Sequence, residues 1–452
     1  MKTVAFHNLG CKVNSYETDY LTQEMTARGF LVVPFSKRAD VYIINTCSVT
    51  NIADRKSRQM LHRAKKENPE AVIAATGCYV QGQSREVLRE VGVDIAVGNN
   101  HKAELPDLIV SFLAQKEGGQ PECICRIDDI AAEKECEKML LLSQTEHTRA
   151  YVKIQDGCNQ FCTYCIIPYM RGRIRSRAEE EILTEIARLT ERGYHEFILT
   201  GIHLSSYGAP QNAGVMQLSG GPLLALIRKI DALPGVRRIR LGSLEPRIVT
   251  EEFARELSSV PSVCPHFHLS LQSGCAETLR RMNRHYTPLE YLEGVRVLRK
   301  YFADPAITTD VIVAFPGETE AEFAASKAFL SEVNFFEMHI FRYSRRKGTL
   351  ADRMDGQVPS DISERRSDEL LEMERRMSLA YRKQWIGREV EILVEEEKEI
   401  DGQRYWVGHT PQYVLAAVSS RKDLRGAFVR AEGVHMLTEE IVFCLEIKED
   451  LG

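Results

Sequence analysis

The sequence predicts an α/β protein of three successive parts: an N-terminal parallel β-sheet, a central partial barrel of about six βα units, and a small C-terminal antiparallel β-barrel. Three observations support this. Short apolar runs alternate with helical patterns over the first eighty residues, the same alternation restarts near Ala150, and after Gly387 short alternating strands replace it. A chain of 452 residues is long enough for two or three domains.

The first part is predicted from strands at residues 4–9, 41–45 and 71–76 and helices at 15–28 and 54–67. Cys11, Cys47 and Cys78 each follow one of these strands. Because the carboxyl ends of parallel strands meet at one edge of a sheet, we expect the three cysteines to converge. A polar stretch at 115–144 is typical of a connection, so the first domain is expected to span residues 1–140.

The central domain, expected at residues 141–380, has strands predicted at 151–155, 197–200, 238–241, 267–271, 307–313 and 336–341, and a closing helix at 360–385. Active sites of such barrels lie at the carboxyl ends of the strands. The last domain, expected at residues 381–452, has strands predicted at 390–395, 404–407, 414–418, 427–431 and 441–447. That spacing is typical of a small barrel of the oligonucleotide-binding kind.

Composition limits the location and the partners. The chain has no long apolar run and no charged-then-apolar leader, so we expect a cytoplasmic protein that does not contact membranes. Its net charge of −5 means that any nucleic acid must bind at a local basic patch. Twelve cysteines without a secretory leader favour metal binding or catalysis over disulfides.

The most informative motif is the loop that contains Cys158, Cys162 and Cys165, directly after a predicted strand. Three thiolates on one short loop can hold three irons of a 4Fe–4S cluster and leave the fourth iron open to a small molecule. A structural zinc site would need a fourth Cys or His close by, and the neighbouring sequence offers none. The spacing therefore favours an iron–sulfur cluster.

This loop, with Tyr164 at its aromatic position, resembles the signature of the radical S-adenosylmethionine (SAM) superfamily. In that family SAM chelates the open iron and is cleaved to a deoxyadenosyl radical. The segments around Cys11, Cys47 and Cys78 resemble the methylthiotransferase family, in which three such cysteines hold a second 4Fe–4S cluster. The resemblance implies a flavodoxin-like N-terminal sheet, a radical SAM barrel and a C-terminal TRAM domain, and it assigns no catalytic residue beyond the clusters.

The segment LGCKVNSYET at residues 9–18 is most similar to the branch that converts N6-threonylcarbamoyladenosine at position 37 of tRNA to its 2-methylthio derivative. The resemblance thus implies SAM and two 4Fe–4S clusters as cofactors. Its partners would be the tRNA anticodon loop, an electron donor such as a flavodoxin or ferredoxin, and a sulfur source. The alternatives are a methylthiotransferase for isopentenyladenosine-37 or for a ribosomal protein, and a non-catalytic iron–sulfur or zinc protein that binds RNA.

Five residues match SAM-site elements of the superfamily, although each could equally be a core residue: Tyr164, Gly201, Ser243, Glu245 and Gln272. Arg171 and Arg173 begin a row, continued by Arg175 and Arg177, that would line one face of an extended segment. This face could contact RNA phosphate or the SAM carboxylate, or it could form a solvated, salt-bridged edge. A second basic group at the barrel mouth comprises Arg342, Arg345, Arg346 and Lys347.

Residues 386–452 contain 8 Lys or Arg against 14 Asp or Glu, a net charge of −6. RNA contacts there would have to come from four basic residues, Arg421, Lys422, Arg425 and Arg430, with Tyr405, Trp406 or Tyr413 for stacking. The acidic run at 395–399 is expected to face away. Cys123, Cys125 and Cys136 are not explained by any motif.

Overall fold

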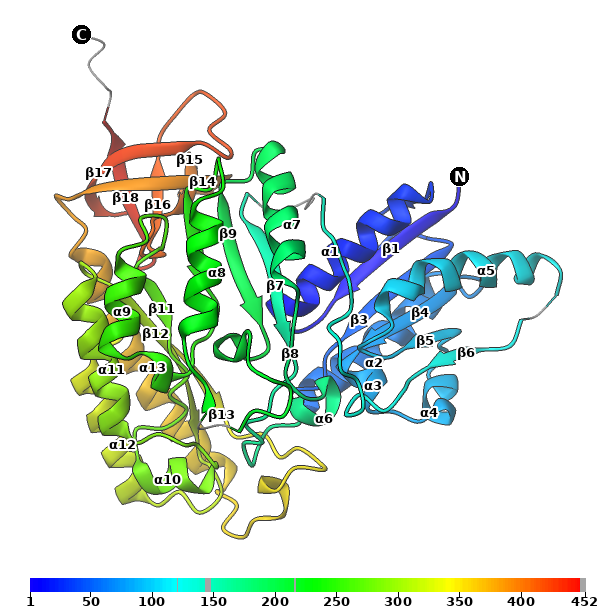
Figure 1. The fold of residues 1–452 in the computed structure, drawn as a ribbon, viewed down its shortest axis with the longest axis horizontal. Helices are drawn as coiled ribbons and strands as arrows, with labels where there is room; N and C mark the ends of the chain where they lie inside the picture. Colours follow the sequence, from blue (N-terminus) through cyan, green and yellow to red (C-terminus); the bar gives the residue numbers. More distant parts are fainter. Residues whose placement is uncertain (120, 143–147, 215–216, 448–452) are drawn as a thin grey trace.

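The chain folds into three parts that follow one another in sequence (Figure 1). The computed structural model describes residues 1–119, 121–142, 148–214 and 217–447. A six-stranded parallel sheet is followed by an incomplete parallel barrel and by a small closed barrel, in agreement with the expected fold class. None of the described helices is long and apolar enough to cross a lipid bilayer.

The N-terminal sheet has helices on both faces. Its strands are β1 (Thr3–Asn8), β2 (Leu31–Val32), β3 (Val41–Thr46), β4 (Val72–Gly77), β5 (Ile95–Val97) and β6 (Ile124–Arg126), and its helices are α1 (Lys12–Ala27), α2 (Asn51–Glu67), α3 (Cys78–Gln81), α4 (Arg85–Glu90) and α5 (Leu105–Glu117). All strand pairs are parallel, in the order β2-β1-β3-β4-β5-β6. The order reverses between β1 and β3, the point at which flavodoxin-like sheets bind ligands.

The connection expected at residues 115–144 contributes a strand. Residues 124–126 form β6, which pairs with β5 at the edge of the sheet. Cys125 packs against an apolar layer of the sheet, and the Cys123 thiol lies 3.3 Å from the carbonyl oxygen of Val93. The prediction of a linker over this whole stretch was wrong, because a strand of three residues carries no periodic pattern.

The central part is an open barrel of parallel strands. They are β7 (Ala150–Asp156), β9 (Glu196–Gly201), β10 (Arg238–Leu241), β11 (His266–His268), β12 (Ala306–Val313) and β13 (Glu337–Arg342), and a short strand, β8 (Arg175–Ser176), runs antiparallel to β7. Isolated bridges join the segments after β10 to the β11 segment, so the six parallel strands form one curved wall. Each strand lies where the sequence predicted it.

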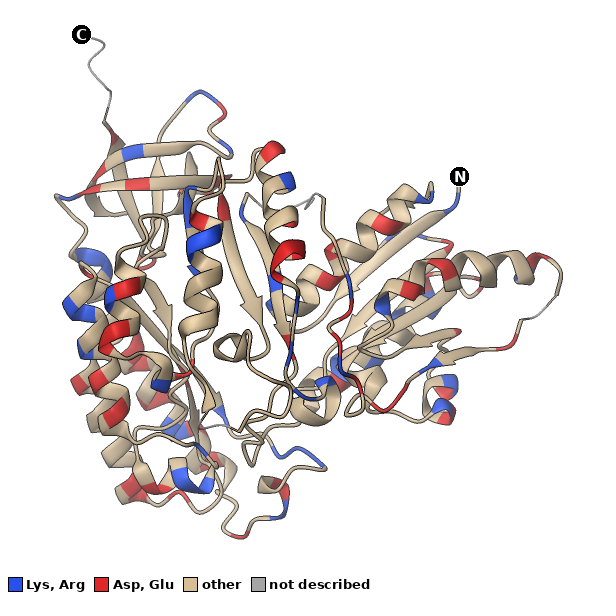
Figure 2. Ribbon diagram, in the orientation of Figure 1, with Lys and Arg blue, Asp and Glu red and all other residues tan. Residues whose placement is uncertain are grey.

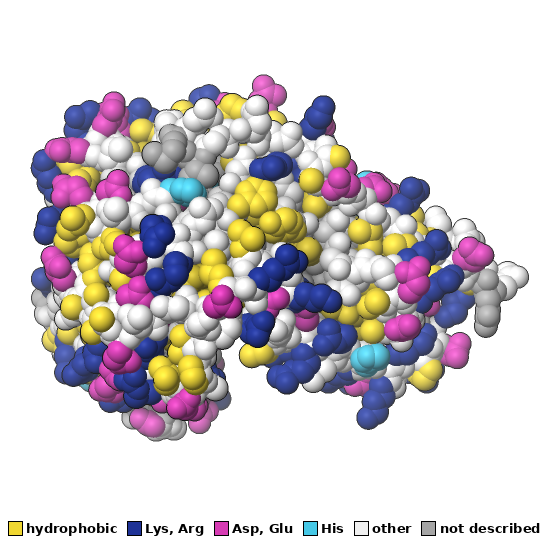
Figure 3. All heavy atoms as spheres, turned by 90° about the horizontal axis from the view of Figure 1, so that it is seen from below, with side chains coloured by type: hydrophobic (Ala, Val, Ile, Leu, Met, Phe, Trp, Pro, Cys, Tyr) yellow, Lys and Arg dark blue, Asp and Glu magenta, His cyan; other side chains and the backbone are white. Residues whose placement is uncertain are grey.

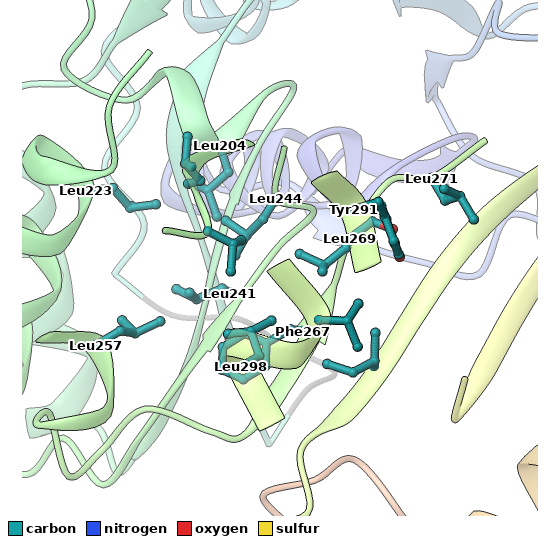
Figure 4. Close-up of a cluster of buried hydrophobic side chains, with 14 of the residues drawn as sticks. Leu204, Leu223, Leu241, Leu244, Leu257, Phe267, Leu269, Leu271, Tyr291 and Leu298 are labelled. Atoms are coloured by element: carbon teal, nitrogen blue, oxygen red, sulfur yellow. The ribbon is translucent and has the colours of Figure 1, made fainter. Parts of the chain in front are cut away.

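Helices cover the outer face of this wall. They are α7 (Glu179–Glu191), α8 (Gly221–Asp231), α9 (Glu251–Ser258), α11 (Pro288–Tyr301), α12 (Glu320–Val333) and α13 (Ser360–Lys383), while the short helices α6 (Ile167–Arg171) and α10 (Ala276–Arg281) lie in the loops after β7 and β11. Leu241 and Phe267 on the strands pack with Leu257 of α9 and Leu298 of α11 (Figure 4). Burying each such side chain contributes about 1.5–3 kcal/mol, so this layer holds the strand ends in place.

The C-terminal part is a closed five-stranded barrel. Its strands are β14 (Glu389–Ile400), β15 (Gln403–His409), β16 (Leu415–Val418), β17 (Phe428–Met436) and β18 (Ile441–Glu446). They close in the order β14-β15-β16-β18-β17, and the β16–β18 pair is parallel while the others are antiparallel. The parallel β16–β18 pair therefore differs from the predicted fully antiparallel barrel. The five strands together form a barrel of the oligonucleotide-binding kind.

This small barrel packs on the amino-terminal ends of the central strands. Arg238 donates to the carbonyl oxygen of His409 at 3.0 Å, and Arg240 donates to that of Pro411 at 2.9 Å. The ring of Tyr413 stacks on His409 and on His266, with centroids 4.3 and 4.9 Å away. In Figure 1, strands β7 and β9 point away from β14–β18. The carboxyl ends of the central strands thus lie at the opposite end.

Candidate iron–sulfur and SAM site

The first group of cysteines converges where the N-terminal strands end. Cys11, Cys47 and Cys78 directly follow β1, β3 and β4, and all three are free thiols. Burial, and after it the neighbouring thiols of Cys78 and Cys11, raise the pKa of Cys47 to about 11. The three thiols are thus close enough to repel one another as anions, as their positions after the strands predicted.

Tight turns and asparagines hold these three loops together. Gly10 has φ +111°, and a Cβ there would lie 3.1 Å from the Cys47 sulfur. Gly77 has φ +98°, and a Cβ there would overlap the carbonyl oxygen of Thr46. The Asn14 side chain donates to the carbonyl oxygens of Leu9 (2.7 Å) and Thr46 (3.1 Å), which ties the Cys11 loop to the Cys47 loop.

The second group lies on the loop after β7. Burial and the Cys162 thiol raise the pKa of Cys158, and the same two causes raise that of Cys165 to about 12. The loop is fixed to the end of α10, because Thr163 donates to the carbonyl oxygen of Arg281 at 2.9 Å and Asn283 donates to that of Phe161 at 3.1 Å. Three free thiols therefore share one short, anchored loop.

The two groups face each other. Helix α3, which begins at Cys78, packs against α6, which begins two residues after Cys165. Asn99 bridges the two groups, since its side chain lies 3.6 Å from the Cys78 sulfur and donates to the carbonyl oxygen of Met170 at 2.8 Å. Six free thiols in two facing groups of three are a donor set that fits two 4Fe–4S clusters, each with one iron left open.

The residues expected near SAM are only partly assembled. Glu245 is 3% exposed and lies 3.3 Å from Arg284 and 3.7 Å from His203. Although burial opposes it, the proximity of His203 and the charge of Arg284 lower the pKa of Glu245 to about 2. Gly201 packs so closely on Gln155 that a Cβ would lie 2.9 Å from its side-chain oxygen.

The other three expected residues have different surroundings. Ser243 is exposed, two residues after the end of β10. Gln272 has φ +70° and is buried, and its backbone N–H donates to the carbonyl oxygen of Asp310 at 2.9 Å. Tyr164 packs its ring edge on Phe315, with centroids 6.2 Å apart. These contacts fix the position of Gln272 and Tyr164 within the protein. Contacts of Ser243, Gln272 and Tyr164 with SAM stay a prediction.

Arg284 is a site residue that the sequence did not reveal. One guanidinium nitrogen donates to the Cys162 sulfur at 3.4 Å, and the other lies 3.3 Å from Glu245. It therefore connects the cysteine loop to the buried carboxylate. It follows α10 in a segment without a recognisable motif, so no pattern could have found it.

The predicted arginine row is mostly buried, which excludes Arg171 as an RNA contact. Arg171 is 0% exposed and pairs with Glu17 at 2.6 Å. Arg175 and Arg177 are buried as well, and Arg177 pairs with Glu185 at 3.0 Å. A solvated edge is equally wrong for these three. Only Arg173 is exposed, with its guanidinium 4.6 Å above the ring of Phe161.

In the C-terminal barrel, the predicted basic residues are exposed but the predicted aromatic ones are not available for stacking. Arg421, Lys422, Arg425 and Arg430 all lie on the surface, and Arg430 pairs with Glu389 at 3.1 Å. Tyr405 and Trp406 are 8% and 7% exposed within apolar layers, and Tyr413 lies between His266 and His409. The stacking prediction was therefore wrong for these three.

The acidic run at 395–399 also needs a correction. Glu395 turns inward and lies 3.0 Å from Arg149, while residues 396–399 are exposed. Its partner Arg149 precedes β7, so the pattern of the last domain alone could not indicate this contact.

Comparisons with known proteins agree with this geometry. Residues 152–330 match the radical SAM superfamily, and residues 3–98 match a family described as uncharacterized protein family UPF0004. The radical SAM methyltransferase TsrM from Kitasatospora setae has a similar fold, with a TM-score of 0.54 and 14% identity over 75% of this chain and 73% of that one.

Relatives resemble the chain over nearly its full length. The threonylcarbamoyladenosine tRNA methylthiotransferase MtaB of Bacillus subtilis is 38% identical over 96% of this chain and 94% of its own, and that of Aquifex aeolicus is 37% identical over 89% and 95%. The tRNA-2-methylthio-N(6)-dimethylallyladenosine synthase of Carboxydothermus hydrogenoformans is 34% identical over 97% of both. The chain therefore belongs to the radical SAM methylthiotransferases, a family that uses SAM and two 4Fe–4S clusters.

Proposed function

We propose that this enzyme converts N6-threonylcarbamoyladenosine at position 37 of tRNA to its 2-methylthio derivative. The proposal rests on one observation: two groups of three free thiols face each other where the N-terminal sheet meets the barrel. Cys11, Cys47 and Cys78 would hold one 4Fe–4S cluster, and Cys158, Cys162 and Cys165 the other. When bound, these clusters and SAM supply the radical and the sulfur chemistry.

The protein's own residues position the reactants. Gly201, Ser243, Glu245 and Gln272 would surround SAM, and Arg284 would hold Glu245 and the Cys162 loop in one geometry. The domain limits 1–140, 141–380 and 381–452 belong to the same proposal. So do a cytoplasmic location, an electron donor such as a flavodoxin or ferredoxin, and a separate sulfur source.

Lys12 supports threonylcarbamoyladenosine over the dimethylallyl substrate. It follows Cys11 as the first residue of α1, it reaches the surface, and it has no salt bridge within the described residues. Burial of its stem, and after it the charges of Arg240 and Arg149, lower the pKa of Lys12, while Asp310 opposes the shift. A threonylcarbamoyl group ends in a carboxylate, whereas a dimethylallyl group is uncharged, so an unpaired cation beside the cluster fits the first. Three relatives named MtaB are 36–38% identical and a fourth is 34% identical, against 33–34% for the dimethylallyl synthases.

The test is anaerobic reconstitution with iron and sulfide, followed by mass spectrometry of nucleosides from tRNA that carries the unmethylthiolated base. The proposal predicts 2-methylthio-threonylcarbamoyladenosine, in amounts that depend on SAM and reductant. Formation of the dimethylallyl derivative instead would refute the substrate. SAM cleavage without any methylthio nucleoside would refute the tRNA reaction.

A further inference from the structure

Helix α2 presents a strongly basic face to solvent. The helix contains six Lys or Arg against two Asp or Glu, a net charge of +4 in a chain whose net charge is −5. Ser57, Leu61 and Ala64 are buried against the sheet. The opposite side, called here the α2 basic face, carries the exposed residues Arg55, Lys56, Arg58, Arg63 and Lys66.

These cations are poorly neutralised by the protein. In residues 1–119, 121–142, 148–214 and 217–447, Arg55, Lys56 and Lys66 have no salt-bridge partner, and Arg63 has one long contact of 3.5 Å to Glu67. The helices that cover the barrel differ, because basic and acidic residues alternate along them (Figure 2). On α13, for instance, Arg365 contacts both Glu320 and Glu369. Helix α2 therefore presents three exposed cations that have no acidic partner within the described residues.

The α2 basic face starts at the site. Helix α2 begins four residues after Cys47, and its first residue, Asn51, donates to the carbonyl oxygen of Arg345 at 2.7 Å. Asp54 pairs with Arg346, which is buried and also donates to Ser48 at 2.6 Å. These contacts join α2 to the loop after β13. From Arg55 to Lys66 the basic face then runs outward for about 17 Å, enough to follow several phosphates.

Exposed apolar side chains occupy the site rim beside this face. Tyr169 after the second cysteine group is 51% exposed, Phe341 at the end of β13 is 52% exposed, and Ile52 at the start of α2 is 56% exposed. On the face seen from below, hydrophobic side chains gather in the middle with Lys and Arg around them and along the N-terminal part at the right (Figure 3). Aromatic rings among cations are the usual contacts of unpaired nucleotides.

The C-terminal barrel is less suited to hold RNA next to the clusters. Its net charge is −6, and it packs on the amino-terminal ends of the central strands, away from the cysteine loops. In contrast, Arg342 at the end of β13, with one long contact of 3.6 Å to Glu364, and Lys347 in the loop after β13 are exposed beside α2. The exposed basic residues and the cysteine loops therefore lie together at the end of the molecule opposite the C-terminal barrel.

We propose that the α2 basic face, extended by Arg342 and Lys347, binds the phosphates of the tRNA anticodon stem–loop, and that Tyr169 and Phe341 stack on its unpaired bases. This inference rests on the proposed function, because it takes tRNA as the substrate. It assigns RNA binding to the N-terminal domain in addition to the C-terminal barrel.

The test compares two reconstituted variants that carry the same reduction in positive charge. One carries Arg55→Gln, Lys56→Gln, Arg63→Gln and Lys66→Gln. The control carries Arg296→Gln, Lys300→Gln, Arg365→Gln and Arg375→Gln, all exposed on α11 and α13. Binding of tRNA is measured over a range of salt concentrations, with iron content and SAM cleavage without tRNA as checks of the fold.

In the α2 variant, the slope of log Kd against log salt should fall by about 3, because each phosphate that the protein no longer neutralises lowers the slope by about 0.7. The control should keep the wild-type slope. Tyr169→Ser should raise Kd without changing the slope. An unchanged slope in the α2 variant, or an equal decrease in the control, would overturn the inference. Nucleoside analysis with the wild-type enzyme tests the proposed reaction separately. If tRNA binds through the α2 basic face but is not methylthiolated, the proposed reaction is refuted and the inferred binding surface is not.

Discussion

Glu17→Gln should destabilise the protein strongly, because Glu17 is the centre of a buried ion cluster between the N-terminal sheet and the barrel. Its carboxylate lies 2.6 Å from Arg171 and 2.8 Å from Lys153 of the barrel, and it also pairs with Lys102 of the N-terminal domain. All four side chains are at most 2% exposed. The substitution leaves buried Lys102 without an anion, while Lys153 and Arg171 keep only Asp156, at 2.6 and 3.1 Å.

The size of the effect follows from this burial. Removing one partner of a buried ion pair costs about 3–5 kcal/mol, because the remaining charge stays desolvated and unpaired. Although burial opposes it, the charges of Arg171, Lys102 and Lys153 hold the pKa of Glu17 well below its usual range. Its contribution to stability is therefore present above the ordinary glutamate pKa and is lost as the pH falls through the lowered one.

Glu24→Gln on the same helix is the matched control. Glu24 lies 2.7 Å from Arg28, but both side chains are about a quarter exposed, so its removal should cost at most about 1 kcal/mol. Equilibrium urea unfolding at neutral pH, followed by far-UV circular dichroism, measures both variants. Similar decreases of less than about 1 kcal/mol in the free energy of unfolding for the two would refute the assignment of Glu17 as the ionic link between the domains.

Three further predictions follow from the site. Lys12→Met should lower methylthiolation of threonylcarbamoyladenosine at least tenfold through KM, while SAM cleavage without tRNA and Lys37→Met controls stay at wild-type rates; an unchanged KM contradicts the carboxylate contact. Arg284→Met removes the cation from Cys162 and Glu245, and since a hydrogen bond to a charged group contributes about 1.5–3 kcal/mol, SAM cleavage should fall by about tenfold or more. Burial raises the pKa of Glu137 to about 7, so its protonated form favours folding and stability should decline as pH rises from below the ordinary glutamate pKa through 7. Glu137→Gln should flatten that decline in thermal unfolding, and an unchanged pH profile would refute it.

The sequence predicted the strands and the cysteine groups because both follow local rules. Apolar runs mark buried parallel strands, and a cysteine directly after such a strand must lie at the carboxyl edge of the sheet. Cys11, Cys47 and Cys78 could therefore be brought together without a structure. That these three cysteines lie opposite Cys165 could not be predicted, because their relative position depends on how the two domains pack.

The errors have the same origin. The alternating arginines were predicted to line a surface, but their partners Glu17 and Glu185 come from α1 and α7, and Glu17 is more than 150 residues distant from Arg171. Tyr405 or Trp406 was predicted to stack on bases, but adjacent residues in a small closed barrel can both be covered, one by the core and one by a second apolar layer. Burial by distant segments is not encoded in local periodicity.

The iron content of single-group variants tests the central claim most directly. Two 4Fe–4S clusters require about eight irons per reconstituted chain. Replacing Cys11, Cys47 and Cys78 by Ala should leave about four irons and preserve SAM cleavage, while replacing Cys158, Cys162 and Cys165 should leave about four irons and abolish it. A wild type that holds zinc, or a variant of either group that keeps all of its iron, would contradict the assignment of one cluster to each group.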